Sequence, residues 1–150
     1  MRHCLTASLA LCLAAVSPAP AQPAPQPTVV EDPAALARLR ANEGITLQWI
    51  GWERRGHVAV TEPGGLVHLS AAQEEASGPA RLTLEGDVLR IDGYSFAFRG
   101  RIVIADTPDV GRLCERDGDF TFLITQNRRY WRLQEMEMCD GLTDYVDIYF

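Results

Sequence analysis

Apolar and polar residues alternate along most of the chain after Gly44, and this two-residue period is typical of β-strands with one buried face. The alternating runs are short, and turn residues such as Glu62-Pro63-Gly64-Gly65 separate them. Together they predict about eight or nine antiparallel strands, because each run has the length of an ordinary strand. The regular spacing of the turns favours an all-β fold, a small antiparallel barrel with a β-sandwich as the alternative.

The stretch from Cys114 to Cys139 shows a hairpin most clearly. Large apolar residues alternate with polar ones on both sides of Asn127-Arg128, where Asn tolerates the positive φ that tight turns require. With those two residues as the loop, Phe122 lies opposite Leu133 on an apolar face. The hairpin is therefore expected to form a main wall of the core.

The same register carries Cys114 and Cys139 to the apolar face, two residues out of step. One bulge near Asp117-Gly118 would bring the two thiols together. The other two cysteines, Cys4 and Cys12, lie in a predicted N-terminal leader. Removal of the leader leaves Cys114 and Cys139, and a pair of cysteines in an exported chain usually forms a disulfide. We therefore predict a disulfide between Cys114 and Cys139.

The stretch from Leu82 to Phe96 predicts a three-strand meander, because Gly86-Asp87 and Asp92-Gly93 are both favoured two-residue hairpin loops. With these turns, every large apolar residue of the stretch falls on one face of the sheet. The third strand continues past Gly100, whose inward position predicts a bend, as at a barrel corner.

Residues 1–21 have the pattern of a secretory signal peptide. Arg2 and His3 give a weakly basic start, Leu5 to Val16 is an apolar run, and Ala19-Pro20-Ala21 is a small-residue cleavage site. The apolar run is too short to span a bilayer, so cleavage after Ala21 is favoured over the alternative of an uncleaved anchor.

Residues 22–31 are rich in Pro and Ala and are expected to form an extended tether. A short helix should follow over residues 34–41, with Asp32 as its N-cap and Pro33 at the first helical position. Residues 32–150 are interpreted as a single β domain, since the chain is too short for two ordinary domains.

The charge of the chain excludes some partners. The sequence has 14 basic residues, all of them arginine, against 20 acidic ones, and its formal net charge is −6. Removal of the leader takes away Arg2 and leaves 13 − 20 = −7. This balance argues against non-specific binding of nucleic acid and against attraction to anionic membranes. The absence of lysine excludes Schiff-base and Ser-Lys catalysis.

No motif for catalysis, a cofactor or a metal is present, since GxSxG, S-x-x-K and Gly-rich phosphate-loop patterns are all lacking. His57 and His68 fall on outward faces without a third ligand at a recognisable spacing, so we interpret them as surface residues. Calcium stays an open alternative, because Asp residues gather near turns at 106–109, 117–119 and 140–147, although without EF-hand order.

Arginine and aromatic residues at hairpin tips or on outward faces are the candidate binding residues, since Arg beside exposed Trp and Tyr is favoured at interfaces. They are Trp52, Arg54, Arg55, Arg128, Arg129, Tyr130 and Arg132. Trp49, in contrast, shares its parity with Ile45 and Leu47 and is predicted to lie in the core.

From Asp106 to the end, the segments D-T-P-D-V-G-R-L-C, T-Q-N-R-R-Y-W-R-L and C-D-G-L-T-D-Y-V-D-I-Y-F resemble small exported bacterial proteins of unknown function. The resemblance covers the last third of the chain and implies export without a specific activity. The overall plan is also similar to small periplasmic barrels such as lysozyme inhibitors and lipocalins, which is an analogy of architecture only.

These observations predict an exported, periplasmic or secreted β domain that binds rather than catalyses. Its ligand would be a partner protein, as for a lysozyme inhibitor, or a glycan or lipid of the cell envelope. The alternative is a small hydrolase acting on envelope material. No cofactor, no nucleic acid and no transmembrane span are expected, and the protein is expected to be a monomer.

Overall fold

The computed structural model describes residues 24–137 and 139–150. It contains nine strands and one α-helix in that part of the chain. The elements are β1 (Val29–Val30), α1 (Pro33–Arg40), β2 (Gly44–Leu47), β3 (His57–Thr61), the 3-10 turn η1 (Pro63–Gly65), β4 (Val67–Glu74), β5 (Arg81–Ile91), β6 (Ser95–Ala105), β7 (Leu113–Leu123), β8 (Tyr130–Leu133) and β9 (Val146–Tyr149).

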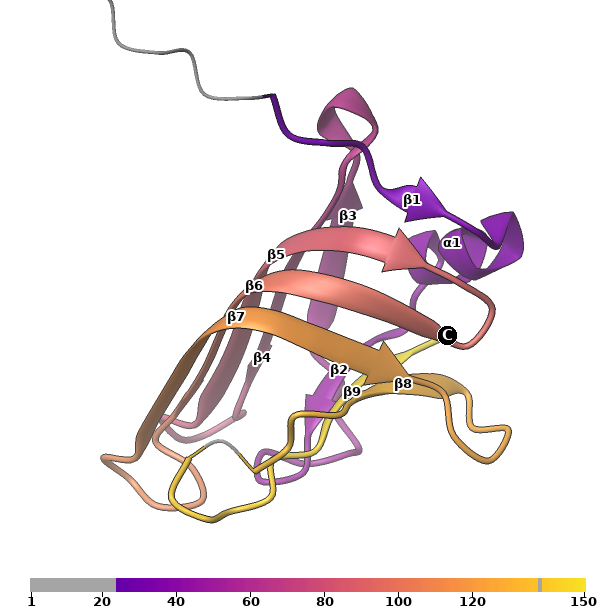
Figure 1. Ribbon diagram of the computed structural model, residues 1–150. Helices are drawn as coiled ribbons and strands as arrows, with labels where there is room; N and C mark the ends of the chain where they lie inside the picture. The colour runs from indigo at the N-terminus through magenta and orange to yellow at the C-terminus, as the bar shows by residue number, and fades with distance from the viewer. Residues whose placement is uncertain (1–23, 138) are drawn as a thin grey trace, which may run out of the picture.

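The strands form one curled sheet in the order β2-β9-β8-β7-β6-β5-β4-β3, in which every neighbouring pair is antiparallel (Figure 1). The two edge strands approach each other, and Ile45 exchanges backbone hydrogen bonds with Gly56 at 3.2 and 2.8 Å. The predicted barrel is therefore confirmed, and it is nearly closed.

Gln73, at 2% exposure, completes the junction where β2 and β3 do not pair. Its Oε1 accepts a hydrogen bond from the backbone N–H of Leu47 at 2.6 Å. Its Nε2 donates to the carbonyl oxygens of Gly51 and Arg54 at 2.9 and 2.8 Å. One amide thus satisfies three backbone groups that no neighbouring strand reaches.

Aromatic side chains fill the interior of the barrel. Phe96 stacks on Phe122 with the ring centroids 4.8 Å apart, and Trp131 meets Phe96 edge-on at 5.6 Å. Phe98 lies edge-on to Phe122 at 6.1 Å. These four side chains are at most 1% exposed, so the interior is a packed core.

A row of three glycines crosses the sheet, with Gly86 opposite Gly100 and Gly100 opposite Gly118. A Cβ at Gly100 would lie 2.2 Å from the carbonyl oxygen of Glu85, so the backbones approach too closely for any side chain. The long strands β5, β6 and β7 curve strongly (Figure 1). The bend predicted at Gly100 is confirmed as part of this row.

The predicted hairpin at Gly86-Asp87 is wrong, because β5 runs without interruption from Arg81 to Ile91. The turn at Asp92-Gly93 exists but is wider than the predicted two-residue loop, since Ile91 pairs with Phe96 and the Asp92 N–H donates to the Ser95 carbonyl at 2.9 Å. Asp92 does shape the turn, since its Oδ1 accepts hydrogen bonds from the N–H groups of the two residues before Phe96, at 2.8 and 2.9 Å. Gly86-Asp87 lies at a bend within the strand, where glycine provides the same conformational freedom of the backbone as in a turn.

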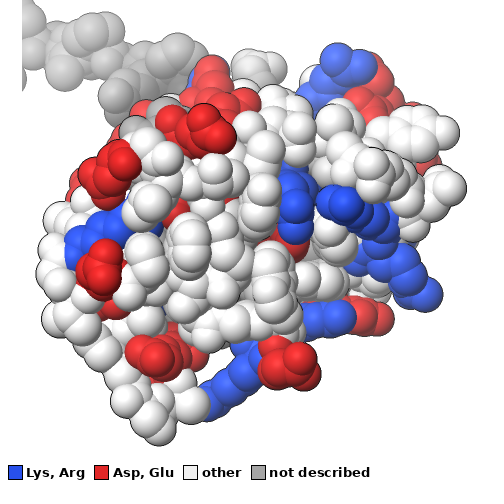
Figure 2. Space-filling model, turned by 90° about the horizontal axis from the view of Figure 1, so that it is seen from below, with Lys and Arg blue, Asp and Glu red and all other residues white. Residues whose placement is uncertain are grey.

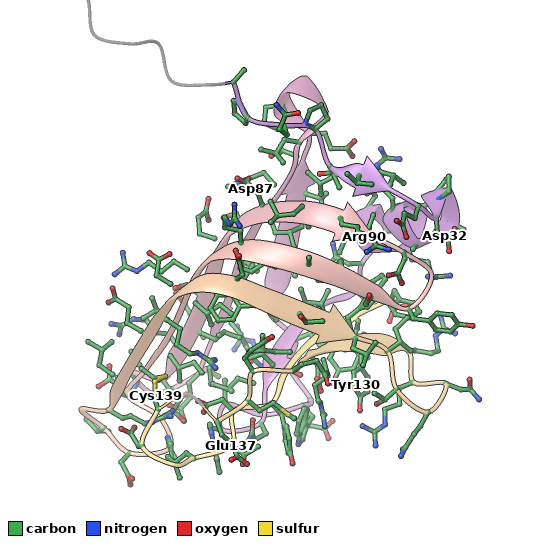
Figure 3. All side chains as sticks on the ribbon, viewed as in Figure 1. Asp32, Asp87, Arg90, Tyr130, Glu137 and Cys139 are labelled. Carbon is green, nitrogen blue, oxygen red and sulfur yellow. A yellow bond between two sulfur atoms is a disulfide. The ribbon has the colours of Figure 1, made fainter. Side chains whose placement is uncertain are left out.

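The hairpin of β7 and β8 has the predicted register, with Phe122 opposite Leu133. Its turn is wider than predicted and begins earlier, since Gln126 and Asn127 have φ of 55° and 58°. Cys114 and Cys139 form the predicted disulfide, with the Cα atoms 5.8 Å apart (Figure 3).

The bulge expected at Asp117-Gly118 is absent, because β7 pairs with β6 in unbroken register. The two-residue offset between the cysteines is taken up after β8, where strand pairing ends at Leu133 and residues 134–137 are irregular.

Helix α1 confirms the predicted start, since Asp32 accepts a hydrogen bond from Ala34 and Pro33 is its first residue. The structure shows the chain already docked before the helix. Thr28 donates to the carbonyl of Val88 at 2.6 Å, and β1 pairs in parallel with the end of β5. The predicted signal peptide, residues 1–21, lies outside the described residues. No described helix is long and apolar enough to cross a membrane.

Candidate functional site

The outer side of β2, β9 and β8 carries a continuous set of arginine and tyrosine side chains. The register explains it, because Tyr149 on β9 faces Tyr130 on β8, and Asp147 faces Arg132 two residues earlier. Inward residues of β9 fill the core, so its alternate residues point out of the barrel. We call this surface the Arg–Tyr strip, defined by Arg55, Tyr130, Arg132, Tyr145 and Tyr149.

Guanidinium groups and phenol rings stack on one another along the strip. Arg55 lies 3.9 Å above the centre of the Tyr149 ring, and the rings of Tyr149 and Tyr130 are 5.3 Å apart. Arg132 lies 5.2 Å from the ring centre of Tyr130 and 4.2 Å from that of Tyr145. Such stacks hold arginine side chains in place. Arg55 also forms an ion pair with Glu43 at 2.8 Å, so only part of its guanidinium group is left for an anion. Figure 3 shows Tyr130 at this outer surface.

Asp147 holds the Arg132 side chain of the strip in place. Its carboxylate is completely buried and accepts two hydrogen bonds from Arg132, each of 2.7 Å. Burial raises the pKa of Asp147, and the Arg132 guanidinium opposes that shift. Burial also raises the pKa of Tyr149, whose hydroxyl accepts a hydrogen bond from Thr46 at 3.2 Å. Arg132 is thus committed to a structural ion pair, and only part of it faces solvent.

The sequence-predicted residues separate into two groups. Arg55, Tyr130 and Arg132 meet in the strip, and Arg128 joins it at 5.7 Å from the Tyr130 ring. Arg129 lies at the rim, where its Nε donates to the terminal Phe150 carbonyl at 3.2 Å.

Trp52 and Arg54 lie outside the strip, in the exposed loop between β2 and β3. Arg54 and Arg55 border a polar hollow of about 370 Å³ beside the barrel junction. The hollow is lined by Arg54, Arg55, Gly56, His57, Ala72, Gln73 and Glu74.

A buried cluster that sequence reasoning missed lies beside this loop. Asp144 is fully buried and receives two hydrogen bonds from Arg112, each of 3.1 Å. The Trp49 indole N–H donates to the same carboxylate at 3.0 Å, and Thr107 donates to the Trp49 carbonyl at 3.3 Å. This Arg112 clamp ties three segments together. Because these partners lie far apart in sequence, no local pattern indicates them.

The parity of Trp49 predicted a core residue, and this prediction is wrong, because Trp49 is 37% exposed. Strand β2 ends at Leu47, and the turn that follows takes Trp49 out of the alternation. The indole then serves as a hydrogen-bond donor to the clamp rather than as core filling.

The two histidines are not paired, since His57 faces Ala72 and His68 faces Thr61 across β3 and β4. His68 instead bonds to Asp87 and Glu85, each at 2.7 Å, and these two contacts, Asp87 first, raise its pKa. Within residues 24–137 and 139–150, no group of three His, Cys, Asp or Glu side chains could hold a metal ion.

Figure 2 views the underside of the molecule, where the strip and the loop meet. Blue side chains are more numerous on its right half, red ones on its left half, and a broad white area lies between them. Arginine side chains thus gather on the right half of this face, with acidic side chains among them.

Comparison with known proteins gives a family but no activity. A family model described as PM1083 family matches residues 27–150. An uncharacterized protein, PM1083 of Pasteurella multocida (strain Pm70), is 36% identical over 116 residues, which are 75% of this chain and 74% of the relative. No solved structure matches. The match begins at the docked segment before α1 and covers the whole described barrel, so the chain belongs to the PM1083 family.

Proposed function

We propose that the protein is an exported binding module that captures an anionic ligand of the cell envelope at the Arg–Tyr strip. The stacked guanidinium and phenol groups on an outer face of the barrel carry this proposal. Arginine and tyrosine are the residues that binding surfaces favour, because both offer large contact area and directional hydrogen bonds. The predicted leader and the Cys114–Cys139 disulfide support export to an oxidising compartment.

The packed interior directs the proposal to the outside of the barrel. A lipocalin-like protein holds its ligand within the barrel, whereas Phe96, Phe98, Phe122 and Trp131 occupy that space here. The hollow beside Arg54 and Arg55 continues the basic surface from the strip toward β4.

A hydrolase is less well supported, because acid–base catalysis needs a carboxyl group that reaches the substrate. The two fully buried carboxylates, Asp144 and Asp147, are each closed off by an arginine that binds both oxygens. Each arginine compensates the charge of a buried carboxylate, and removing it would leave that charge unpaired, so neither carboxylate is free for catalysis.

The binding proposal is tested by retention of the purified protein on immobilised heparin and on immobilised polyglutamate, two polyanions with different backbones. The variant R54E/R128E reverses two charges on the basic side, and neither arginine has a carboxylate partner in the described part of the chain. We expect this variant to bind the preferred polyanion about tenfold more weakly, as truncation of interface arginines commonly does.

The matched control is R99E/R101E, which makes the same change of net charge on the outer face of β6. Arg99 and Arg101 form exposed ion pairs with Asp119 and Glu115, whose loss costs little. Because the reversed charges also face Asp117 and Asp119 across the sheet, the melting temperature of the control is measured as well. Equal retention of R54E/R128E and R99E/R101E would show that only net charge matters and would overturn the proposal. Retention of neither polyanion by the parent protein would do so as well.

A further inference from the structure

The loop between β2 and β3 exposes two tryptophans on the underside, Trp49 at 37% and Trp52 at 42%. Trp49 has its hydrogen-bond partner in Asp144, whereas the Trp52 indole has none in the described part of the chain. Large exposed aromatic side chains of this kind are typical of contact surfaces, because removing their apolar surface from water lowers the free energy.

The loop is held in one conformation. Gln73 fixes the carbonyls of Gly51 and Arg54, and the Arg112 clamp fixes Trp49 from the other side. A fixed loop loses little conformational entropy when its side chains are buried in a complex, so association is favoured.

Charge is distributed unequally about this loop. The turn at 106–112, which carries Asp109, and the acidic residue Glu137 lie on one side of it. The 124–129 turn carries Arg128 and Arg129 on the other side. Figure 2 shows the result, with acidic side chains more numerous on the left half, basic ones on the right half and a neutral area between.

We infer that this underside is a contact surface for a second copy of the same chain. A two-fold axis that lies in the face, between its halves, places the acidic half of one copy opposite the basic half of the other. The same axis brings the central loops together, so Trp52 of each copy is covered. A two-fold contact requires a patch that is complementary to itself, and a face divided in charge meets that requirement.

This dimer goes beyond the proposed binding function and departs from the monomer expected from sequence. It uses the basic half of the underside, so an anionic ligand and the second copy compete for the same arginines. The dimer is measured without any polyanion, and its failure would leave the proposed function untouched.

The first experiment is sedimentation velocity of the purified protein over a range of concentrations. We expect a monomer–dimer equilibrium that weakens as salt is raised, because part of the attraction is between charges. Trp52→Ala should raise the dissociation constant about tenfold or more, as loss of a central tryptophan does in other interfaces. The control Val29→Ala removes a side chain that is 55% exposed on β1, away from the underside, and should leave the equilibrium unchanged.

The second experiment reverses each half separately. R128E/R129E makes both halves acidic, and D109R/E137R makes both halves basic, so each variant alone should be monomeric. An equimolar mixture of the two should form a heterodimer, because complementary charges again face each other. A monomeric parent protein at all concentrations, or a mixture that stays monomeric while the parent dimerises, would overturn the inference.

Discussion

Gly100 shows how a single position can shape the sheet. A Cβ there would lie 2.2 Å from the Glu85 carbonyl oxygen in the backbone of β5 and 2.7 Å from the buried Phe98 ring. Gly100→Ala should therefore destabilise the fold by about 1–3 kcal/mol, the usual cost of overpacking. Thermal unfolding measures this, with Gly93→Ala as control, since a Cβ at Gly93 meets only the side-chain oxygen Oδ2 of Asp32 at 3.2 Å and no backbone atom. Equal melting temperatures of the two variants would contradict the close approach.

Arg132 was predicted from sequence as a binding residue, yet its main partner is the buried Asp147. Arg132→Ala should cost about 3–5 kcal/mol near neutral pH, because it leaves a buried carboxylate without a counter-ion. Truncation of Arg132 would thus confuse a binding defect with unfolding, so Arg54 and Arg128 are better probes.

The loss in Arg132→Ala should depend on pH in a defined direction. Burial raises the pKa of Asp147 in the folded state above its unfolded value, so protonation favours the folded state and stability falls as pH rises through that window. Removing Arg132 strengthens this effect, and the difference from the parent should shrink as pH falls from 7 toward 4. Urea midpoints across this range test it, with Arg129→Ala as the exposed control. A difference independent of pH would show that Asp147 does not cause it.

At the scale of elements, the hairpin of β7 and β8 and its disulfide make one unit. The bond between Cys114 and Cys139 closes a loop with a sequence separation of 25. In the chain-entropy treatment, a loop of that size stabilises folding by about 3.5 kcal/mol. C114A/C139A should therefore melt about 10 °C or more below the parent protein. Reduced parent protein should show the same loss, whereas two free thiols in unreduced protein would contradict the bond.

Elements could be predicted from sequence wherever side-chain parity settles the question. The register of Phe122 against Leu133 follows from parity alone, because a slip by one residue would turn the apolar face to water. Gly86-Asp87 was misread because its role depends on Gly100, which lies opposite Gly86 only in the folded sheet, and on Gly118, which lies opposite Gly100. A Gly-Asp dipeptide at a bend within a strand and one at a hairpin turn have the same local sequence.

For the whole molecule, the candidate site was foreseen as a class of residue but not as an arrangement. Arg55 is exposed, and Arg128 and Tyr130 are half-buried. The stack that joins Arg55 to Tyr130 depends on Tyr149, which β9 brings from the end of the chain. The Arg112 clamp joins segments far apart in sequence in the same way. Contacts of this kind follow from barrel closure, which turn spacing suggests without fixing the partners.

Closure of the barrel itself rests on Gln73, since backbone pairing of β2 with β3 is confined to Ile45 and Gly56. Gln73→Leu keeps the volume of the side chain but leaves the Leu47 N–H and two carbonyl groups without partners. Each unsatisfied buried group costs about 1–3 kcal/mol, so the junction should open more readily than the rest of the barrel.

Native-state hydrogen exchange tests this closure at single amides. The Leu47 amide should exchange at least about tenfold faster in Gln73→Leu, because one lost hydrogen bond of about 1.5 kcal/mol corresponds to that factor. Amides of β6, which lies between two long partner strands, should change only by the overall loss of stability. An equal acceleration of exchange at all amides of the sheet would mean that Gln73 contributes only to global stability and not to local closure at Leu47. Unchanged exchange at Leu47 would show that the barrel closes without the glutamine amide.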